Sequence, residues 1–138
     1  MSKVKNPLKA RTIIFYLSVI FGSILLDRIS KQLVIQYMPM TDGASAPIDL
    51  IHGVLRFIHI ENQGAAFGSF ADKRWVFMVF SVVAIILIVF SVIKENPQSM
   101  WTKSALALIV GGGAGNMIDR IARGSVTDYI DVYCVPFY

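Results

Sequence analysis

The sequence is short of charged residues and has almost no cysteine. Only 16% of its 138 residues are Asp, Glu, Lys or Arg, whereas soluble domains carry about 25%. Cys134 is the single cysteine, so no disulfide can form within the chain. The low charge excludes an ordinary soluble domain, and the cysteine count excludes a secreted disulfide scaffold.

Motifs for the common cofactor and nucleophile chemistries are also missing. The GGGAG run at 111–115 lacks the last glycine of a dinucleotide fingerprint, and there is no GK[ST] phosphate loop or G-x-S-x-G serine-hydrolase motif. His52 and His59 lie seven residues apart, unlike zinc-binding spacings, so we expect both on a loop or strand surface. No histidine lies near Cys134 in sequence, which disfavours a cysteine nucleophile. These absences disfavour a nucleotide site, a zinc site, and a cysteine or serine nucleophile.

Long apolar runs are what the sequence has in excess. Residues 75–93 contain no charged side chain, and about 18 such residues in a row already indicate a membrane-spanning helix. Two shorter apolar segments become spans at about 12–28 and 102–118 when each is extended by a turn whose polar side chains reach the headgroups. Helices are expected because an open strand edge in lipid would leave backbone groups unpaired. The predicted fold class is an all-α integral-membrane helical bundle in which residues 1–138 form one domain.

The first span has an alternative interpretation as a cleavable signal peptide. Four basic residues precede the apolar run that starts at Thr12, which is the pattern of such a peptide. However, no A-x-A-like cleavage site follows, because the run ends in LLDRISK. We therefore expect an uncleaved anchor.

The basic residues are distributed unevenly between the polar segments. Residues 1–11 and 94–103 hold six Lys or Arg and one acid, whereas 27–74 and 119–138 hold seven Lys or Arg and eight acids. Cytoplasmic segments next to membrane spans carry the excess of basic residues. The amino terminus and 94–103 are therefore predicted to be cytoplasmic, and the other two segments to lie on the outer face.

The outer segment at 40–74 is too long to be a simple turn. Residues 41–47 have the composition of a loop, whereas 54–60 are β-branched and aromatic and predict a strand or hairpin arm. We expect a small β/loop platform on the membrane surface, with Trp75 as an aromatic anchor at the interface.

Polar residues gather on the predicted outer face, at or after the ends of the spans. Four are aspartates, two are asparagines and one is an arginine: Asp27, Asn62, Asn116, Asp119, Arg120, Asp128 and Asp131. Ionisable groups at membrane depth are costly and usually functional, so chemistry at this face is our leading hypothesis. The alternatives are structural: Asp27 and Asp119 as interfacial charges that end helices, and Asn62 as part of a turn. The GGGAG run has the alternative role of allowing close helix packing.

Four short motifs follow one another along the chain: LDRISK at 26–31, NQGAAF at 62–67, GGGAGNMIDR at 111–120 and VTDYID at 126–131. They match the patterns D-x-x-[ST]-K, N-x-G-A-A-F, G-G-x-x-G-N-x-x-D-R and V-x-D-[FY]. In this order, and with this topology, the chain resembles lipoprotein signal peptidase (signal peptidase II), the integral-membrane aspartyl peptidase of bacteria. Each motif is weak alone, but together they extend over most of the chain.

The resemblance implies a reaction, a substrate and a location. The reaction is hydrolysis of the signal peptide just before the lipid-modified cysteine of a diacylglyceryl prolipoprotein, by two carboxylates around one water and without a cofactor. The family works at the outer face of the bacterial inner membrane as a four-span protein. We therefore expect prolipoprotein and membrane lipid as partners, no nucleic acid, and a monomer.

The resemblance also implies roles for individual residues. The family's first catalytic aspartate matches Asp128. Positions that hold the substrate backbone and orient the site match Asn62, Asn116 and Arg120. Motif positions with a structural character match Asp27, Lys31, Gly64 and Asp119. Asp131 has no catalytic counterpart, and we interpret it as a solvated neighbour.

One part of the family's pattern is missing from the sequence. The second catalytic aspartate lies in an F-N-x-A-D motif that opens a fourth helix, and after VTDYID the sequence reads VYCVPFY without it. We therefore expect a truncated form of a longer protein, inactive as it stands. Asp119 or Asp131 could replace the missing partner, the latter if it faced Asp128 on a helical turn. The alternative function is a small non-catalytic membrane protein that binds lipid or a partner helix through its GGGAG face.

Overall fold

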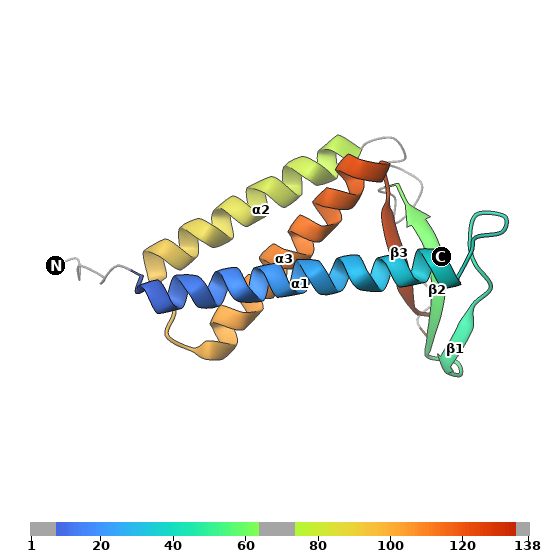
Figure 1. The fold of residues 1–138 in the computed structure, drawn as a ribbon, viewed down its shortest axis with the longest axis horizontal. Helices are drawn as coiled ribbons and strands as arrows, with labels where there is room; N and C mark the ends of the chain where they lie inside the picture. Colours follow the sequence, from blue (N-terminus) through green and yellow to red (C-terminus); the bar gives the residue numbers. More distant parts are fainter. Residues whose placement is uncertain (1–7, 64–73, 135–138) are drawn as a thin grey trace.

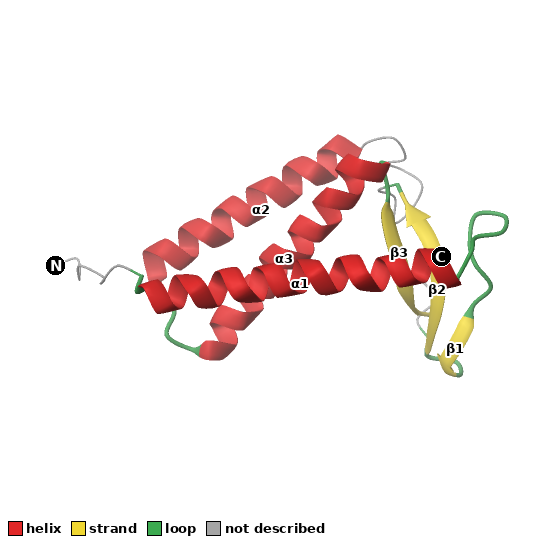
Figure 2. Cartoon of the chain, in the orientation of Figure 1, coloured by secondary structure: helices red, strands yellow, loops and turns green. Residues whose placement is uncertain are grey.

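The computed structural model describes residues 8–63 and 74–134, which form three helices and three strands. Their order is α1 (Ala10–Tyr37), β1 (Ile48–Ile51), β2 (Leu55–Asn62), α2 (Arg74–Glu95), α3 (Met100–Arg123) and β3 (Val126–Val132). The helices lie together, and the sheet lies at one end of the group (Figure 2). α1 runs from near the amino terminus to the sheet, and α3 ends where β3 begins (Figure 1).

Two helices in the described part of the chain are long and apolar enough to cross a membrane by length and composition: Ala10–Tyr37 and Trp75–Glu95. Only 6% of the apolar window of each is buried within the molecule, so these side chains need an apolar surrounding such as lipid. The expected third span, 102–118, lies within α3. α3 does not reach the mean hydropathy of such a helix, because its glycine run and Asn116 lower the average.

α1 is longer than predicted from its apolar residues. It continues to Tyr37, so Asp27 lies inside the helix and does not end it. The additional turns contact the sheet, where Tyr129 Oη donates a hydrogen bond to Ser30 Oγ at 2.9 Å. Contact with β3 thus stabilises α1 beyond residue 28, where the predicted span ended.

Two glycines let α1 and α3 pack closely. A Cβ atom on Gly111 would overlap Ser23 Oγ, and one on Gly115 would lie 2.5 Å from Asp27 Oδ2. The helix-packing role of the GGGAG run is therefore confirmed. Because α1 covers this face of α3, the face is not available for the partner helix of the alternative function.

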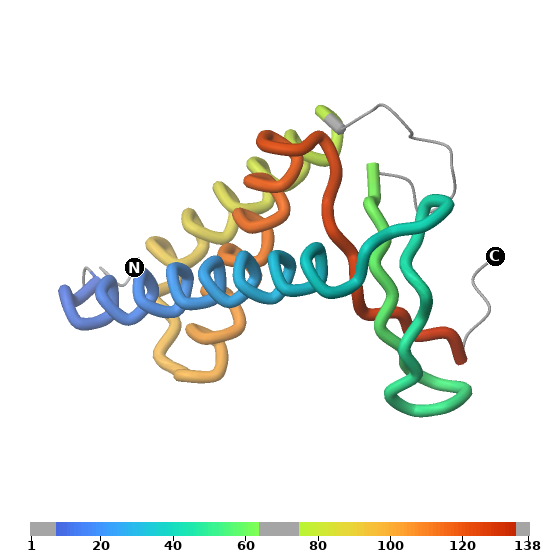
Figure 3. The backbone as a smooth tube through the Cα atoms, turned by 45° about the vertical axis from the view of Figure 1, so that its right-hand side comes forward, coloured from blue at the N-terminus to red at the C-terminus, as the bar shows by residue number. Residues whose placement is uncertain are grey.

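The three strands form one antiparallel sheet in the order β1-β2-β3. The strand predicted at 54–60 is present as β2, whereas β1 and β3 were not predicted as strands. The fold is therefore a helical membrane bundle with a real sheet, and the all-α description is corrected to that extent. Figure 3 shows β3 running back from the end of α3 alongside β2. Gly124 makes this reversal possible, because its φ of +84° caps α3 in the left-handed region that glycine favours.

Buried residues form two groups of different character. Away from the sheet, Tyr16, Val92 and Ala107 make a small apolar cluster. The buried polar and charged residues are Lys31, Ser45, His59, Asp119, Ser125 and Thr127. The expectation of a surface histidine is confirmed for His52, whose side chain is 96% exposed, but is wrong for His59, which is 3% exposed. His59 is buried because its Nδ1 lies 2.8 Å from the carbonyl oxygen of Met38, which follows α1.

Candidate active site

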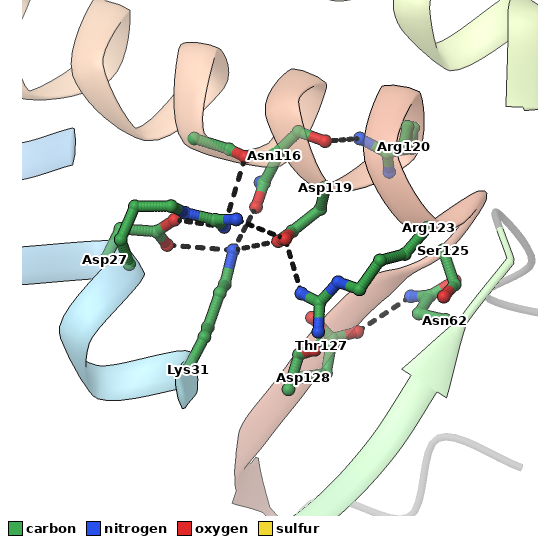
Figure 4. A network of polar contacts seen from close by, with 12 residues as sticks. Asp27, Lys31, Asn62, Asn116, Asp119, Arg120, Arg123, Ser125, Thr127 and Asp128 are labelled. Carbon is green, nitrogen blue, oxygen red and sulfur yellow. Dashed lines mark hydrogen bonds and ion pairs between the residues drawn. The ribbon is translucent and has the colours of Figure 1, made fainter. Parts of the chain in front are cut away.

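Three cations surround one buried carboxylate where α1 meets α3. The oxygens of Asp119, which is fully buried, lie 2.7 Å from Arg28 Nη1 and 2.7 Å from Lys31 Nζ. Arg123 Nη2 lies 2.5 Å from the same carboxylate, one helical turn away on α3. Asp27 adds a second anion, 2.8 Å from Lys31 Nζ (Figure 4). Burying charged groups costs free energy, and this ion cluster offsets the cost only because its members have several short contacts.

Lys31 is enclosed by polar groups within this cluster. Its side chain is 5% exposed, and its ammonium donates hydrogen bonds to Asp119 and to Asn116 Oδ1, the latter at 2.9 Å. It also forms an ion pair with Asp27. Because Asn116 accepts the bond from Lys31 through Oδ1, its amide N–H groups are directed away from Lys31 and can serve another acceptor.

Asp128 lies on β3 and accepts a hydrogen bond from a side-chain amide. Asn62 Nδ2 donates to Asp128 Oδ2 at 2.8 Å, from the end of β2. The register pairs Asn62 with Val126 and Ile60 with Asp128, so the two polar side chains are diagonal neighbours on one face of the strand pair. Asp128 is exposed, which leaves its carboxylate within reach of water.

An open cavity of about 200 Å³ connects Asp128 with the ion cluster. Its polar lining comes from α1, α3 and β3: Asp27, Lys31, Asn116, Thr127, Asp128 and Tyr129. Of the two carboxylates in this lining, Asp27 is paired with Lys31 and Arg28, whereas Asp128 accepts from the neutral amide of Asn62. The cavity therefore holds one carboxylate that is paired with two cations and one that is exposed and bonded to an amide.

Arg120 lies beside this cavity and does not line it. Its guanidinium sits 5.5 Å from the centre of the Phe77 ring on α2, and Nη1 approaches the Asn116 carbonyl oxygen at 3.5 Å. Its charge also interacts with that of Asp128. Of the predicted substrate-binding residues, Asn62 is thus bonded to Asp128 and Asn116 lines the same cavity, whereas Arg120 does not line it. Gly64 lies outside the described residues.

Neither predicted replacement for the second carboxylate is in a position to act. Asp119 is enclosed by three cations and is not accessible to water. Asp131 pairs with Arg56 at 2.6 Å, so it is not simply a solvated neighbour. The segment is a strand and not a helical turn, and residues three apart on a strand point to opposite faces, so Asp131 points away from Asp128.

Glu61 is a site residue that the sequence interpretation missed. It accepts hydrogen bonds from Ser125 Oγ at 2.5 Å and Thr127 Oγ1 at 2.9 Å. Burial raises the pKa of Glu61, but the bonds from Ser125, Thr127 and His59 and the charge of Arg123 outweigh it, so the pKa lies below its ordinary value. The sequence signal for Glu61 was that it directly precedes the candidate residue Asn62, at the end of a predicted strand rich in β-branched residues.

The arrangement is suited to acid–base chemistry on a backbone held at a membrane edge. An exposed carboxylate fixed by an amide can take a proton from water, and neighbouring amide donors can hold a carbonyl group. Within residues 8–63 and 74–134, no three His, Cys, Asp or Glu side chains gather as a metal site.

Several known proteins are similar in sequence to this chain. A family model described as signal peptidase (SPase) II matches residues 19–138. The lipoprotein signal peptidase of Halalkalibacterium halodurans is 40% identical over 122 residues, which are 88% of this chain and 76% of that protein. The lipoprotein signal peptidase of Brevibacillus brevis is 37% identical over 114 residues, or 83% of this chain and 74% of that protein.

Solved structures agree with the fold. A structure described as a bacterial membrane enzyme, determined in meso at 1.9 Å resolution, superposes with a TM-score of 0.72 and 26% identity. The superposition covers 87% of this chain and 75% of the solved one. A second structure with the same description, at 2.3 Å resolution, has the same TM-score and identity and is covered to 71%.

Proposed function

The chain belongs to the signal peptidase II family, and we propose that it is an aspartic endopeptidase that removes signal peptides from lipid-modified bacterial prolipoproteins. The observation that carries this proposal is the placement of Asp128, exposed on the wall of a polar cavity and held at 2.8 Å by the Asn62 amide. A carboxylate held in this way can accept a proton from water without moving first.

In the proposed reaction, Asp128 is the ionised carboxylate that removes a proton from the attacking water. A second carboxyl group stays protonated and donates to the scissile carbonyl oxygen. Two neighbouring carboxyl groups separate into these roles because like charges at short range do not both ionise. The carbon–nitrogen bond breaks when the leaving nitrogen receives a proton, and no cofactor is required.

The second carboxyl group is proposed to lie outside the described residues. Asp119 is enclosed by Arg28, Lys31 and Arg123, and Asp131 faces away from Asp128. Asp27 shares the cavity, but its two oxygens are already paired with Arg28 and Lys31. By resemblance to the family, this role belongs to an F-N-x-A-D motif that the 138 residues lack, so we propose that they are inactive by themselves.

Asn62, Asn116 and Arg120 are proposed to hold the substrate. Lys31 occupies Oδ1 of Asn116, which turns the amide donors of Asn116 toward a substrate carbonyl group. Asn62 holds Asp128 and limits its rotation. Arg120 extends the polar surface along α3 and is proposed to orient the peptide on the side of α2.

The protein is proposed to be a monomeric, multi-pass protein of the inner membrane with the site on its outer face. The sheet and Asp128 lie at one end of the helices, and residues 96–99 connect α2 with α3 at the other end (Figure 1). The basic residues of 1–11 and 94–103 favour a cytoplasmic location for that other end. Membrane lipid would cover the exposed apolar side chains of α1 and α2.

Cleavage of a purified diacylglyceryl prolipoprotein in detergent tests this function. We expect no cleavage by the 138 residues alone, and cleavage after they are extended by a segment with F-N-x-A-D followed by about 20 apolar residues. Asp128→Asn in the extended chain should abolish cleavage. Asp49→Asn is the matched control, because Asp49 is exposed on β1 next to the exposed His52.

Two results would contradict parts of the proposal. Cleavage by the 138 residues alone, if abolished by Asp128→Asn, would show that the second carboxyl group is already present. Cleavage by the extended chain that survives Asp128→Asn would remove Asp128 from the reaction.

A further inference from the structure

The reverse side of the strand pair that carries Asp128 holds a second group of polar residues. His59 and Glu61 alternate with Ile60 and Asn62 along β2, so they share the face opposite Asn62. On β3, Thr127 likewise points away from the face of its neighbour Asp128. Polar residues therefore occupy both faces of the same two strands.

Glu61 joins the two strands on this reverse face. Thr127 lies directly opposite it in the register and donates to Oε1 at 2.9 Å, while Ser125 donates to Oε2 at 2.5 Å. Arg123 Nη1, at the end of α3, lies 3.8 Å from Oε1. One carboxylate thus contacts three residues within a five-residue segment, 123–127, that leads directly into Asp128.

The register needs such a fixed point because β2 is irregular beside the site. A bulge between Phe57 and Ile60 shifts the pairing with β3. Bulges re-aim side chains, and a slip by one residue would move every side chain of a strand to the other face. The two hydroxyl bonds to Glu61 hold the pairing on the site side of the bulge, where the Ile60–Asp128 and Asn62–Val126 pairs follow.

His59 connects Glu61 with the end of α1. The Met38 carbonyl oxygen can only accept, so His59 Nδ1 carries a hydrogen at this 2.8 Å contact. His59 Nε2 lies 3.4 Å from Glu61 Oε1, so the ring bridges Met38 and Glu61. The backbone N–H of His59 also donates to Ser45 Oγ, which holds the strand from the other side.

We propose that Glu61, supported by His59, is a positioning residue that holds Asn62 and Asp128 in their hydrogen-bonded geometry from the reverse face of the sheet. This inference rests on the proposed function, since the geometry matters for substrate. It assigns no chemical step to Glu61.

The test uses the full chain in detergent micelles, labelled with ¹⁵N in asparagine. The sequence has four asparagines, so few side-chain amide signals overlap, and Asn62→Ser identifies the signal of Asn62. Asp128→Ala removes the hydrogen bond and so gives the chemical shift of the Asn62 signal in its absence. Glu61→Gln, which keeps the side-chain size and removes the charge, should move the Asn62 signal toward that position. Asp49→Asn, a matched change on β1, should leave it in place.

Affinity for substrate provides the second measurement. The ligand is a synthetic signal peptide that ends beyond a diacylglyceryl cysteine. We expect Glu61→Gln to raise its dissociation constant by roughly tenfold, the loss typical when a half-buried, charged hydrogen-bond acceptor is neutralised. If Glu61→Gln does not fold, Thr127→Val replaces it, with a change of roughly threefold for one lost neutral bond.

The outcomes separate the inference from the function on which it rests. A wild-type chain that does not bind the lipopeptide contradicts the proposed function, and the Asn62 signal still decides the positioning role. An Asn62 signal that is unchanged in Glu61→Gln overturns the inference. An unchanged dissociation constant in a chain that does bind overturns it as well.

Discussion

Asp119 has three ion pairs on a single buried carboxylate, so stability depends on it more than on other charged residues of the site. In Asp119→Asn, Lys31, Arg28 and Arg123 would face a neutral amide. Removing one partner of a buried pair leaves the other charges uncompensated. We expect the free energy of unfolding to fall by about 3 kcal/mol, at the lower end of the usual range because both arginines are about one third exposed.

Unfolding in detergent measures this effect. Asp49→Asn is the control, because it removes a carboxylate that is 45% exposed. Equal midpoints for Asp119→Asn and Asp49→Asn would contradict the structural role of the ion cluster.

Glu61 makes a pH-dependent contribution to stability. Its pKa in the folded state is lowered, so the folded state favours the ionised form more than the unfolded state does. The stabilisation is therefore present above the unfolded value of roughly 4.3 and is lost as the pH falls through the folded value. We expect the free energy of unfolding to decrease less between pH 5 and pH 3 in Glu61→Gln than in the original chain. Unfolding measured at each pH gives this decrease. An identical pH profile in the variant would show that Glu61 is not held in this way.

Individual site residues were predictable where a motif supplied them. Asn62 and Asp128 were both proposed from motifs, and they are hydrogen-bonded across two strands. The alternative in which Asp131 faces Asp128 assumed a helical turn, where residues three apart lie on the same side. On the observed strand they lie on opposite sides. Glu61 and His59 were missed because burial by another part of the chain leaves no mark on the local sequence.

At the scale of elements, the contact between α1 and α3 depends on glycine at two positions. Gly115→Ala would place a methyl group 2.5 Å from Asp27 Oδ2 and 2.9 Å from its Cγ, and would disturb the ion pairs of Asp27. We expect a loss of about 1–3 kcal/mol in the free energy of unfolding. Gly112 is the control, since no atom lies within 4 Å of a Cβ there, and Ala is the better helix former.

Thermal unfolding of the two variants in the same detergent tests this packing. Gly112→Ala should equal or exceed the stability of the original chain, and Gly115→Ala should fall below it. A Gly115→Ala variant as stable as Gly112→Ala would mean that the two helices are not in close contact at this point.

The elements were predicted in proportion to how local their signals are. The apolar runs located all three helices, since lipid-facing side chains leave an uninterrupted pattern. The end of α1 was placed too early because its last turns are stabilised by contact with the sheet. β3 was missed because its short segment between Gly124 and Cys134 was interpreted as a tail, although its residues are β-branched and aromatic.

At the scale of the whole molecule, the proposed orientation can be tested at the single cysteine. Cys134 is exposed and follows β3, at the end of the molecule that is proposed to face outward. A membrane-impermeant maleimide should therefore label it in intact spheroplasts. In a Cys134→Ser background, Gln98→Cys in the connection between α2 and α3 should be labelled only after permeabilisation. The reverse pattern would contradict the orientation.

The overall architecture was partly accessible to sequence reasoning. Charge bias and apolar runs predict which ends of the helices lie together, because both depend on the membrane as solvent. The convergence of α1, α3 and β3 on one cavity depends on tertiary contacts, above all the pairing of Lys31 with Asn116 and Asp119. Such contacts join segments far apart in the sequence, and no single segment predicts them.

The account depends most directly on Asp128 as the carboxylate that activates water. The measurement is the rate at which the F-N-x-A-D-extended chain releases the signal peptide of a diacylglyceryl prolipoprotein, with the cut position determined by mass spectrometry. We predict a cut immediately before the lipidated cysteine and a decrease in rate of roughly 10²–10⁴-fold in Asp128→Asn, the usual contribution of a general base. An unchanged rate in Asp128→Asn, with Asp49→Asn as reference, would contradict the account.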